Sequence, residues 1–148
     1  DVVVNWDKLK QEEKSYRISI LDGISKSQSA LMSAQKISKK VVKVGFEWDC
    51  VDSLKDCIKS EMKEFEQAVQ NNDTKNMEEE MGDLLFAIVN LSRWYKINPE
   101  LALNSANKKF IKRFKKMEEL KTKPFEDYSF EEFNNLWKKA KIELEKGN

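Results

Sequence analysis

Two pairs of carboxylates, each with members three residues apart, are the part of this sequence best suited to chemistry. Glu61 and Glu64 form one pair, and Glu80 and Asp83 form the other. Side chains three residues apart share one face of an α-helix, so each pair can direct two carboxylates to the same side. Two antiparallel helices would then bring four acids around one small volume. Mutual repulsion would raise their pKa values unless a cation neutralised them.

The chain contains no histidine, which limits the chemistry that these acids can take part in. Ser-His-Asp and Cys-His arrangements are excluded, as is any metal site that needs imidazole. Ligation by oxygen alone suits Mg²⁺, with Mn²⁺ as a second possibility. A Glu-x-x-Glu pair is more often a solvated helix face, and the acids at 78–80 could simply complement the helix dipole. Asp83 is harder to explain in that way, because it is the only charge in the apolar run 81–91.

Opposed blocks of charge lie behind a nearly neutral total of 27 Lys and Arg against 26 Asp and Glu. Residues 61–83 carry eight acids and two lysines, whereas residues 108–123 carry eight bases and two acids. Lys109 and Arg113 are four residues apart and share a helix face. The basic block is either a solvated outer face or a grip for phosphates opposite a metal site. The neutral total does not favour nucleic acid as a partner, and no Gly-rich phosphate loop is present.

The elements that must position these residues are helices. Apolar residues recur at spacings of three and four, and they predict helices over about 27–45, 51–70, 75–95, 99–122 and 130–144. Pro99 stands at a favoured first helical position, and Ser129 with Glu132 has the spacing of a capping box. We therefore expect an all-α bundle of about five helices, with an N-terminal arm over 1–26 and one domain over 27–148. The nearly all-apolar run 81–91 is typical of a helix inside a bundle or in a subunit interface.

Few features of the sequence indicate where in the cell the protein is located. No run approaches the roughly 18 apolar residues of a membrane span. Cys50 and Cys57 match neither a metal motif nor a disulfide framework, and this favours a reducing, cytoplasmic compartment. The sequence begins with Asp1 rather than Met, which suggests a fragment of a longer protein.

The acids and their surroundings resemble the MazG nucleoside triphosphate pyrophosphohydrolases, and in particular the C-terminal catalytic domain of the two-domain members. That family carries Glu-Glu-x-x-Glu, a spacer, and Glu-x-x-Asp; here Glu61 and Glu64 are followed after fifteen residues by Glu80 and Asp83. Three further segments also resemble the family in its order, so that the likeness covers most of residues 5–145: 30–36, 44–48 and 106–114.

The resemblance implies an α-helical, usually dimeric hydrolase that converts nucleoside triphosphates to monophosphate and pyrophosphate with Mg²⁺. It implies that the catalytic and metal-binding residues are Glu61, Glu64, Glu80 and Asp83. Lys109 and Arg113 match positions that contact the phosphates, and Trp137 stands where a nucleotide-contacting aromatic is expected. Core packing beside Leu136 and Ala140 is the alternative for Trp137. Trp48 and the Gln35-Lys36 pair are further candidates for contact with base or phosphate.

One position departs from the family pattern. Ser60 stands where the family has the first glutamate of its motif, and a hydroxyl can be neither a strong anionic ligand nor a general base near neutral pH. The alternative function is therefore a catalytically impaired helical dimer that binds nucleotide or a partner protein. A narrow activity on a deoxy or damaged nucleotide is a third hypothesis.

Overall fold

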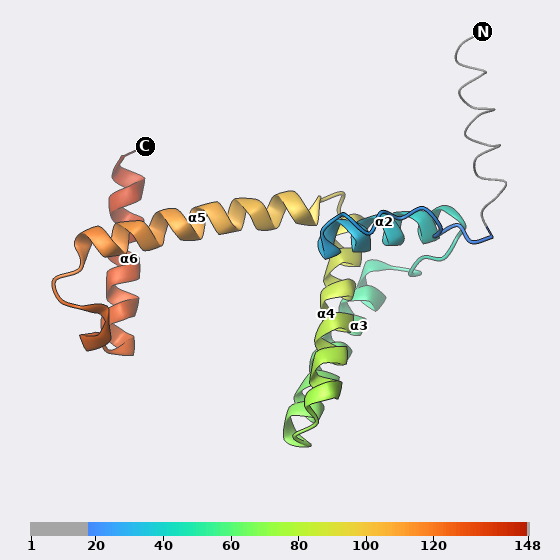
Figure 1. The fold of residues 1–148 in the computed structure, drawn as a ribbon, viewed down its shortest axis with the longest axis horizontal. Coiled ribbons are helices and arrows are strands. Elements are labelled where there is room, and N and C mark those ends of the chain that lie inside the picture. The colour runs from blue at the N-terminus through green and yellow to red at the C-terminus, as the bar shows by residue number, and fades with distance from the viewer. Residues whose placement is uncertain (1–17, 148) are drawn as a thin grey trace, which may run out of the picture. The chain divides into compact units, whose positions relative to one another are not determined.

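The computed structural model describes residues 18–147, which contain five α-helices, a 3-10 turn and no strand. The all-α prediction is confirmed. The chain divides into two compact units, the first reaching Glu100 and the second beginning at Leu101. Figure 1 shows the helices in chain order: α2 (Ala30–Lys43), α3 (Val51–Gln70), α4 (Thr74–Trp94), α5 (Pro99–Leu120), the turn η1 (Phe125–Asp127) and α6 (Phe130–Lys146).

Helices α2, α4 and α6 each begin where a side chain accepts a hydrogen bond from a free backbone N–H group. The Ser29 hydroxyl accepts from the amide of Met32 at the start of α2, and the Asp73 carboxylate caps α4 in the same way. Ser129 and Glu132 form the predicted capping box of α6. These caps leave fewer orphaned donors at the helix starts, which is why the observed starts lie within three residues of the predicted ones.

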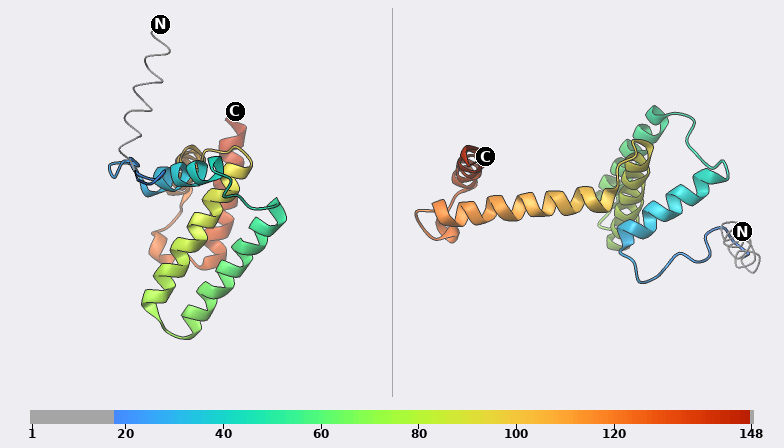
Figure 2. Two further views of the ribbon diagram at one scale, coloured as in Figure 1. Left: turned by 90° about the vertical axis from the view of Figure 1, so that its right-hand side faces the viewer. Right: turned by 90° about the horizontal axis from the view of Figure 1, so that it is seen from above.

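The first unit is built on α4. Helices α3 and α4 lie side by side and antiparallel (Figure 2), joined by a tight turn in which Asn72 has a φ of 53°. Helix α2 packs on α4 as well. The core of the unit consists of small and branched side chains between these helices, together with two buried polar residues of α2: Leu54, Ala68, Ala87, Val89, Gln35 and Ser38.

The second unit has its own core, formed where the end of α5 meets α6. Met117, Leu136 and Ala140 are buried there, and a set of aromatic rings packs around them. Every residue from 101 to 112 is exposed, so the first half of α5 contributes nothing to this core.

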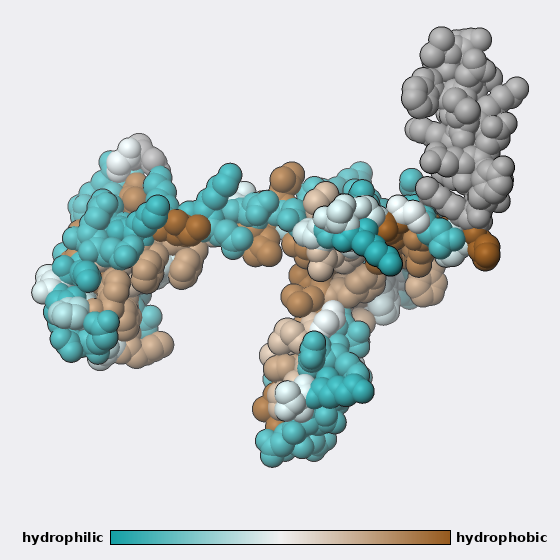
Figure 3. All heavy atoms as spheres, in the orientation of Figure 1, coloured by the Kyte–Doolittle hydropathy of each residue, from teal (hydrophilic) through white to brown (hydrophobic). Residues whose placement is uncertain are grey.

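Helix α4 is not enclosed within the described part of the chain. Leu85 is 53% exposed and Ile88 is 43% exposed, and Figure 3 shows apolar surface along this helix. Of the two settings predicted for the apolar run 81–91, the middle of a bundle is not found among residues 18–147. A subunit interface stays a prediction.

The predicted arm over 1–26 is described only from residue 18, and residues 18–29 form turns and bends; residues 1–17 lie outside the described part. A single domain over 27–148 stays a prediction beside the two units seen here. No helix among the described residues is both long and apolar enough to cross a membrane.

Candidate functional site

Three of the four predicted acids meet between α3 and α4. Glu61 and Glu64 come from α3 and Glu80 comes from α4, and each offers a carboxylate oxygen within 4.8 Å of the others. The antiparallel packing of the two helices brings these oxygens together, because the short turn between them places position 80 opposite positions 61 and 64. The group has the composition of an all-oxygen cation site.

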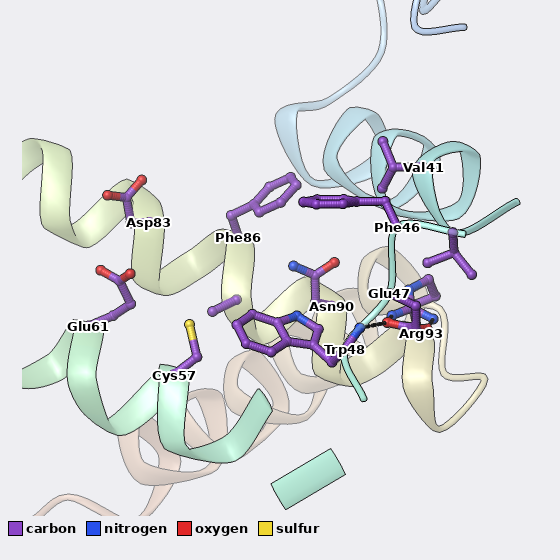
Figure 4. Close-up of a pocket in the computed structure, with 12 residues that line it drawn as sticks. Val41, Phe46, Glu47, Trp48, Cys57, Glu61, Asp83, Phe86, Asn90 and Arg93 are labelled. Carbon is purple, nitrogen blue, oxygen red and sulfur yellow. Dashed lines mark hydrogen bonds and ion pairs between the residues drawn. The ribbon is translucent and has the colours of Figure 1, made fainter. Parts of the chain in front are cut away.

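Asp83 lies one turn further along α4. It faces Glu61 across the opening of a cavity (Figure 4), and both side chains line that cavity. Asp83 is exposed, although its neighbours in sequence are apolar. Among the described residues, no atom lies within 4 Å of the place where a Cβ of Gly82 would stand, so the helix surface at Gly82 is open.

The acids perturb one another strongly. Loss of surrounding water raises the pKa of Glu80 to about 7, and the nearby Glu64 and Glu61 carboxyls add to the rise. Burial also raises the pKa of Glu61, followed by the effect of Glu64. The pKa of the Cys57 thiol is raised by burial and then by the negative charge of Glu61. Perturbed carboxyl groups of this kind are typical of functional sites.

Two oxygens of the cluster are buried and have no hydrogen-bond partner within residues 18–147. They are Oε2 of Glu61 and Oε2 of Glu80. A buried acceptor that finds no donor costs free energy, and a divalent cation would satisfy both oxygens at once. The donor set therefore fits a hard cation such as Mg²⁺ or Mn²⁺.

A cavity of about 450 Å³ opens beside the acids. The loop after α2 forms one wall: Gly45 adopts a φ of 95°, which turns the chain and brings Phe46 and Trp48 to the cavity. Phe86 and Asn90 of α4 also line the cavity, with Phe86 on the same side as Phe46 (Figure 4). The volume is in the range of roughly 300–1,000 Å³ that small-molecule sites occupy.

A chain of hydrogen bonds supports the inner end of this cavity. Both terminal nitrogens of Arg93 contact the Glu47 carboxylate at 2.6 Å. Arg93 Nε donates to the Ser38 hydroxyl at 2.7 Å, and Ser38 donates to Oδ1 of Asn90 at 2.5 Å. Ser38 is fully buried. The network ties the loop to α2 and α4 and fixes the amide of Asn90.

The predicted phosphate and nucleotide contacts belong to the second unit. Lys109 is exposed on α5, and Arg113 holds its guanidinium 5.5 Å from the centre of the Trp137 ring. Trp137 is partly buried against the core of that unit and has Phe110 at 5.4 Å between ring centres. Trp137 thus packs against the core of the second unit, as the alternative for this residue expected. Its ring also carries the guanidinium of Arg113.

The remaining candidate residues lie in different parts of the first unit. Trp48 lines the cavity, whereas Gln35 is buried in the core of the first unit and Lys36 is exposed away from the lining. Ser60 is exposed and does not line the cavity. Cys50 and Cys57 are both free thiols.

Sequence reasoning missed the network around Arg93 and the role of Phe86. A signal was present, since Asn90 and Arg93 continue the face of α4 that carries Glu80 and Asp83 at steps of three and seven. Glu47 and Ser38 gave no comparable signal, because they come from segments far from α4 in sequence.

Comparison with known proteins identifies the family of this chain. Residues 50–118 match the family described as the MazG nucleotide pyrophosphohydrolase domain. The chain is 41% identical over 140 residues to the nucleoside triphosphate pyrophosphohydrolase/pyrophosphatase MazG of Thermotoga maritima, covering 92% of this chain and 54% of that protein. It is 44% identical over 126 residues to a nucleoside triphosphate pyrophosphohydrolase of Escherichia coli, covering 81% and 47%.

An uncharacterized protein of Bacillus subtilis, YabN, is 41% identical over 146 residues, or 95% of this chain and 30% of that protein. The chain thus spans about half the length, or less, of the curated relatives it matches. The matched residues 50–118 contain all four predicted acids together with Lys109 and Arg113. The resemblance read from the sequence is confirmed: this chain carries a MazG nucleotide pyrophosphohydrolase domain.

Proposed function

We propose that this chain is a Mg²⁺-dependent nucleoside triphosphate pyrophosphohydrolase. The observation that carries the proposal is the cluster of Glu61, Glu64 and Glu80 beside a cavity of nucleotide size. Two of its oxygens are buried without a partner, and a cation would satisfy them. The MazG match and the activity named for the relatives from Thermotoga maritima and Escherichia coli support the same activity for this chain.

In the proposed reaction the oxygen of a water molecule attacks the α-phosphorus of the triphosphate. The bond from that phosphorus to the oxygen bridging to the β-phosphorus breaks, and pyrophosphate leaves with that oxygen. Glu61, Glu64, Glu80 and Asp83 would hold the cation, and one of these acids would accept the proton that the water loses. Mg²⁺ held by them, or Mn²⁺ in its place, would supply Lewis-acid stabilisation of the phosphate oxygens.

Lys109 and Arg113 contact the phosphates and offset the charge that develops on the leaving pyrophosphate. Arg113 suits this task because its guanidinium, packed over Trp137, has little freedom to lose on binding. Trp137 presents the rest of its ring for contact with the nucleotide. A substitution of Arg113 is therefore expected to lower turnover, although its side chain is partly exposed.

We further infer that two copies of the chain form a homodimer through α4. Its exposed face carries Met81, Leu85 and Ile88, which are 38%, 53% and 43% exposed. Large apolar side chains gathered along one helix are typical of a face that another subunit covers. Sedimentation equilibrium tests this: Leu85→Glu should yield monomers, and an unchanged dimer would refute the assignment. A cytoplasmic setting and the absence of a nucleic-acid partner stay predictions.

The function is tested by pyrophosphate release from a panel of nucleoside triphosphates, with Mg²⁺ and with excess EDTA. We expect Mg²⁺-dependent release that falls about 100-fold or more in Glu80→Gln. Glu66→Gln is the matched control, because Glu66 is an exposed acid of α3 outside the cluster. No release from any nucleotide would refute the proposal.

The same assay decides the alternative raised by Ser60. An impaired nucleotide-binding dimer would show turnover only after Ser60→Glu. We expect the unmodified chain to be active, because Glu61, Glu64 and Glu80 assemble with Ser60 in place and Ser60 does not line the cavity.

A further inference from the structure

The cavity of the first unit offers a flat ring a place between aromatic faces. Figure 4 shows Phe46 and Phe86 at one side of the opening and Trp48 at the other, with Asn90 between them. Aromatic side chains stack on nucleobases whatever the base, because every base has a π-face. The cavity reaches the acids through Glu61 and Asp83, which line it. A group bound there can thus be continuous with a phosphate chain held at the acids.

The charges of the lining favour a neutral occupant over a phosphate. Arg93 is the sole base among the lining residues that the structure describes, and its terminal nitrogens are engaged by Glu47 at 2.6 Å. The other charged residues of the lining are acids. A phosphate would meet repulsion from these acids and would find the guanidinium already paired. An uncharged heterocycle meets neither obstacle.

The amide of Asn90 has a fixed polarity. Arg93 Nε can only donate, so the Ser38 hydroxyl accepts from it at 2.7 Å. The hydrogen of that hydroxyl then goes to Oδ1 of Asn90 at 2.5 Å. Asn90 Oδ1 is therefore turned toward Ser38, and Figure 4 shows the amide nitrogen turned toward the side of Phe86 and Trp48. Asn90 presents a donor to the cavity, not an acceptor.

We propose that this cavity is the nucleobase subsite and that Asn90 selects a base with a carbonyl over one with an amino group at the same ring position. The inference rests on the proposed function. Phe46, Trp48 and Phe86 hold the ring, and Asn90 Nδ2 donates to the ring carbonyl oxygen. An amino group in that place would set donor against donor. Hypoxanthine is thus preferred to adenine, and uracil to cytosine.

The experiment compares ITP with ATP and UTP with CTP, since each pair differs by carbonyl against amino. We expect kcat/KM to favour the carbonyl member by about 10-fold in the unmodified chain. Asn90→Asp offers an acceptor instead and should invert the ratio. Ser92→Ala, on the same helix but outside the lining, should leave it unchanged. Ratios within about 2-fold in the unmodified chain, or no change in a folded Asn90→Asp variant, would overturn the proposal.

A binding measurement separates this subsite from the proposed activity. Inosine and adenosine are titrated into the Mg²⁺-free protein and followed by NMR, which requires neither hydrolysis nor phosphate. We expect inosine to bind about 10-fold more tightly, and Trp48→Leu to abolish binding of both. If hydrolysis is absent but inosine is preferred, the function fails and the subsite stands. Loss of nucleoside binding in Trp137→Leu, with retention in Trp48→Leu, would overturn the subsite.

Discussion

The pair formed by Glu47 and Arg93 is expected to anchor the loop that carries Phe46 and Trp48. Its two contacts measure 2.6 Å, and its side chains are 26% and 11% exposed. Exposed pairs contribute roughly 0.2–1 kcal/mol, while breaking a buried pair costs about 3–5 kcal/mol. The contribution of a half-buried bidentate pair to the unfolding free energy is expected between these limits. We expect about 1.5–3 kcal/mol of lost unfolding free energy for Glu47→Gln or Arg93→Met, close to the usual range for hydrogen bonds to charged groups.

The assay is a double-mutant cycle of urea unfolding, followed by circular dichroism. If the two residues act through each other, the double variant costs less than the two single variants together, with a coupling of about 1–2 kcal/mol. Lys116 and Glu119 provide the comparison, because their pair is 28% and 67% exposed and lies within one helix. A coupling for Glu47 and Arg93 no larger than that of this exposed pair would refute the reasoning.

Three further predictions concern the packing and caps. Leu54→Ala removes a fully buried side chain of α3 and should lower the unfolding free energy by about 2–5 kcal/mol, against a small change for the exposed Met62→Ala. Ser129→Ala removes the capping box of α6 and should cost about 1 kcal/mol, measured by urea unfolding. The hydrogen bond from Lys123 lowers the pKa of Glu132 from 4.5 to about 2, so its stabilisation is present above pH 4.5 and lost as the pH falls toward 2. The advantage of the unmodified chain over Glu132→Gln should shrink in that window; a constant difference would contradict the assignment.

The helices and most of the carboxylate cluster follow from local chemistry. Ser129 with Glu132, and Pro99, set helix starts through groups a few residues away, so sequence spacing is sufficient to find them. The proximity of Glu61 and Glu80 could be predicted for a similar reason. Each lies on a long helix, and the connection between the two helices is short enough to force an antiparallel pair.

The inner end of the cavity could not be predicted in this way. Ser38, Glu47 and Arg93 come from α2, a loop and the end of α4, and only tertiary packing of these three segments joins them. The sequence could not predict that Asp83 is exposed. An apolar run shows that a helix surface needs to be covered, but it does not show whether the same chain or another subunit covers it. The division of the chain at Glu100 has no signal in the periodic pattern of α5, which is continuous across it.

Hydrolysis in ¹⁸O-labelled water tests the central claim most directly. Attack at the α-phosphorus places the label in the nucleoside monophosphate and leaves the pyrophosphate unlabelled, as mass spectrometry of the products would show. We predict labelled monophosphate from the unmodified chain and from Glu66→Gln, and almost none from Glu80→Gln. Orthophosphate as the product, label in the pyrophosphate, or full activity of Glu80→Gln would contradict the claim that this carboxylate cluster performs nucleoside triphosphate pyrophosphohydrolysis.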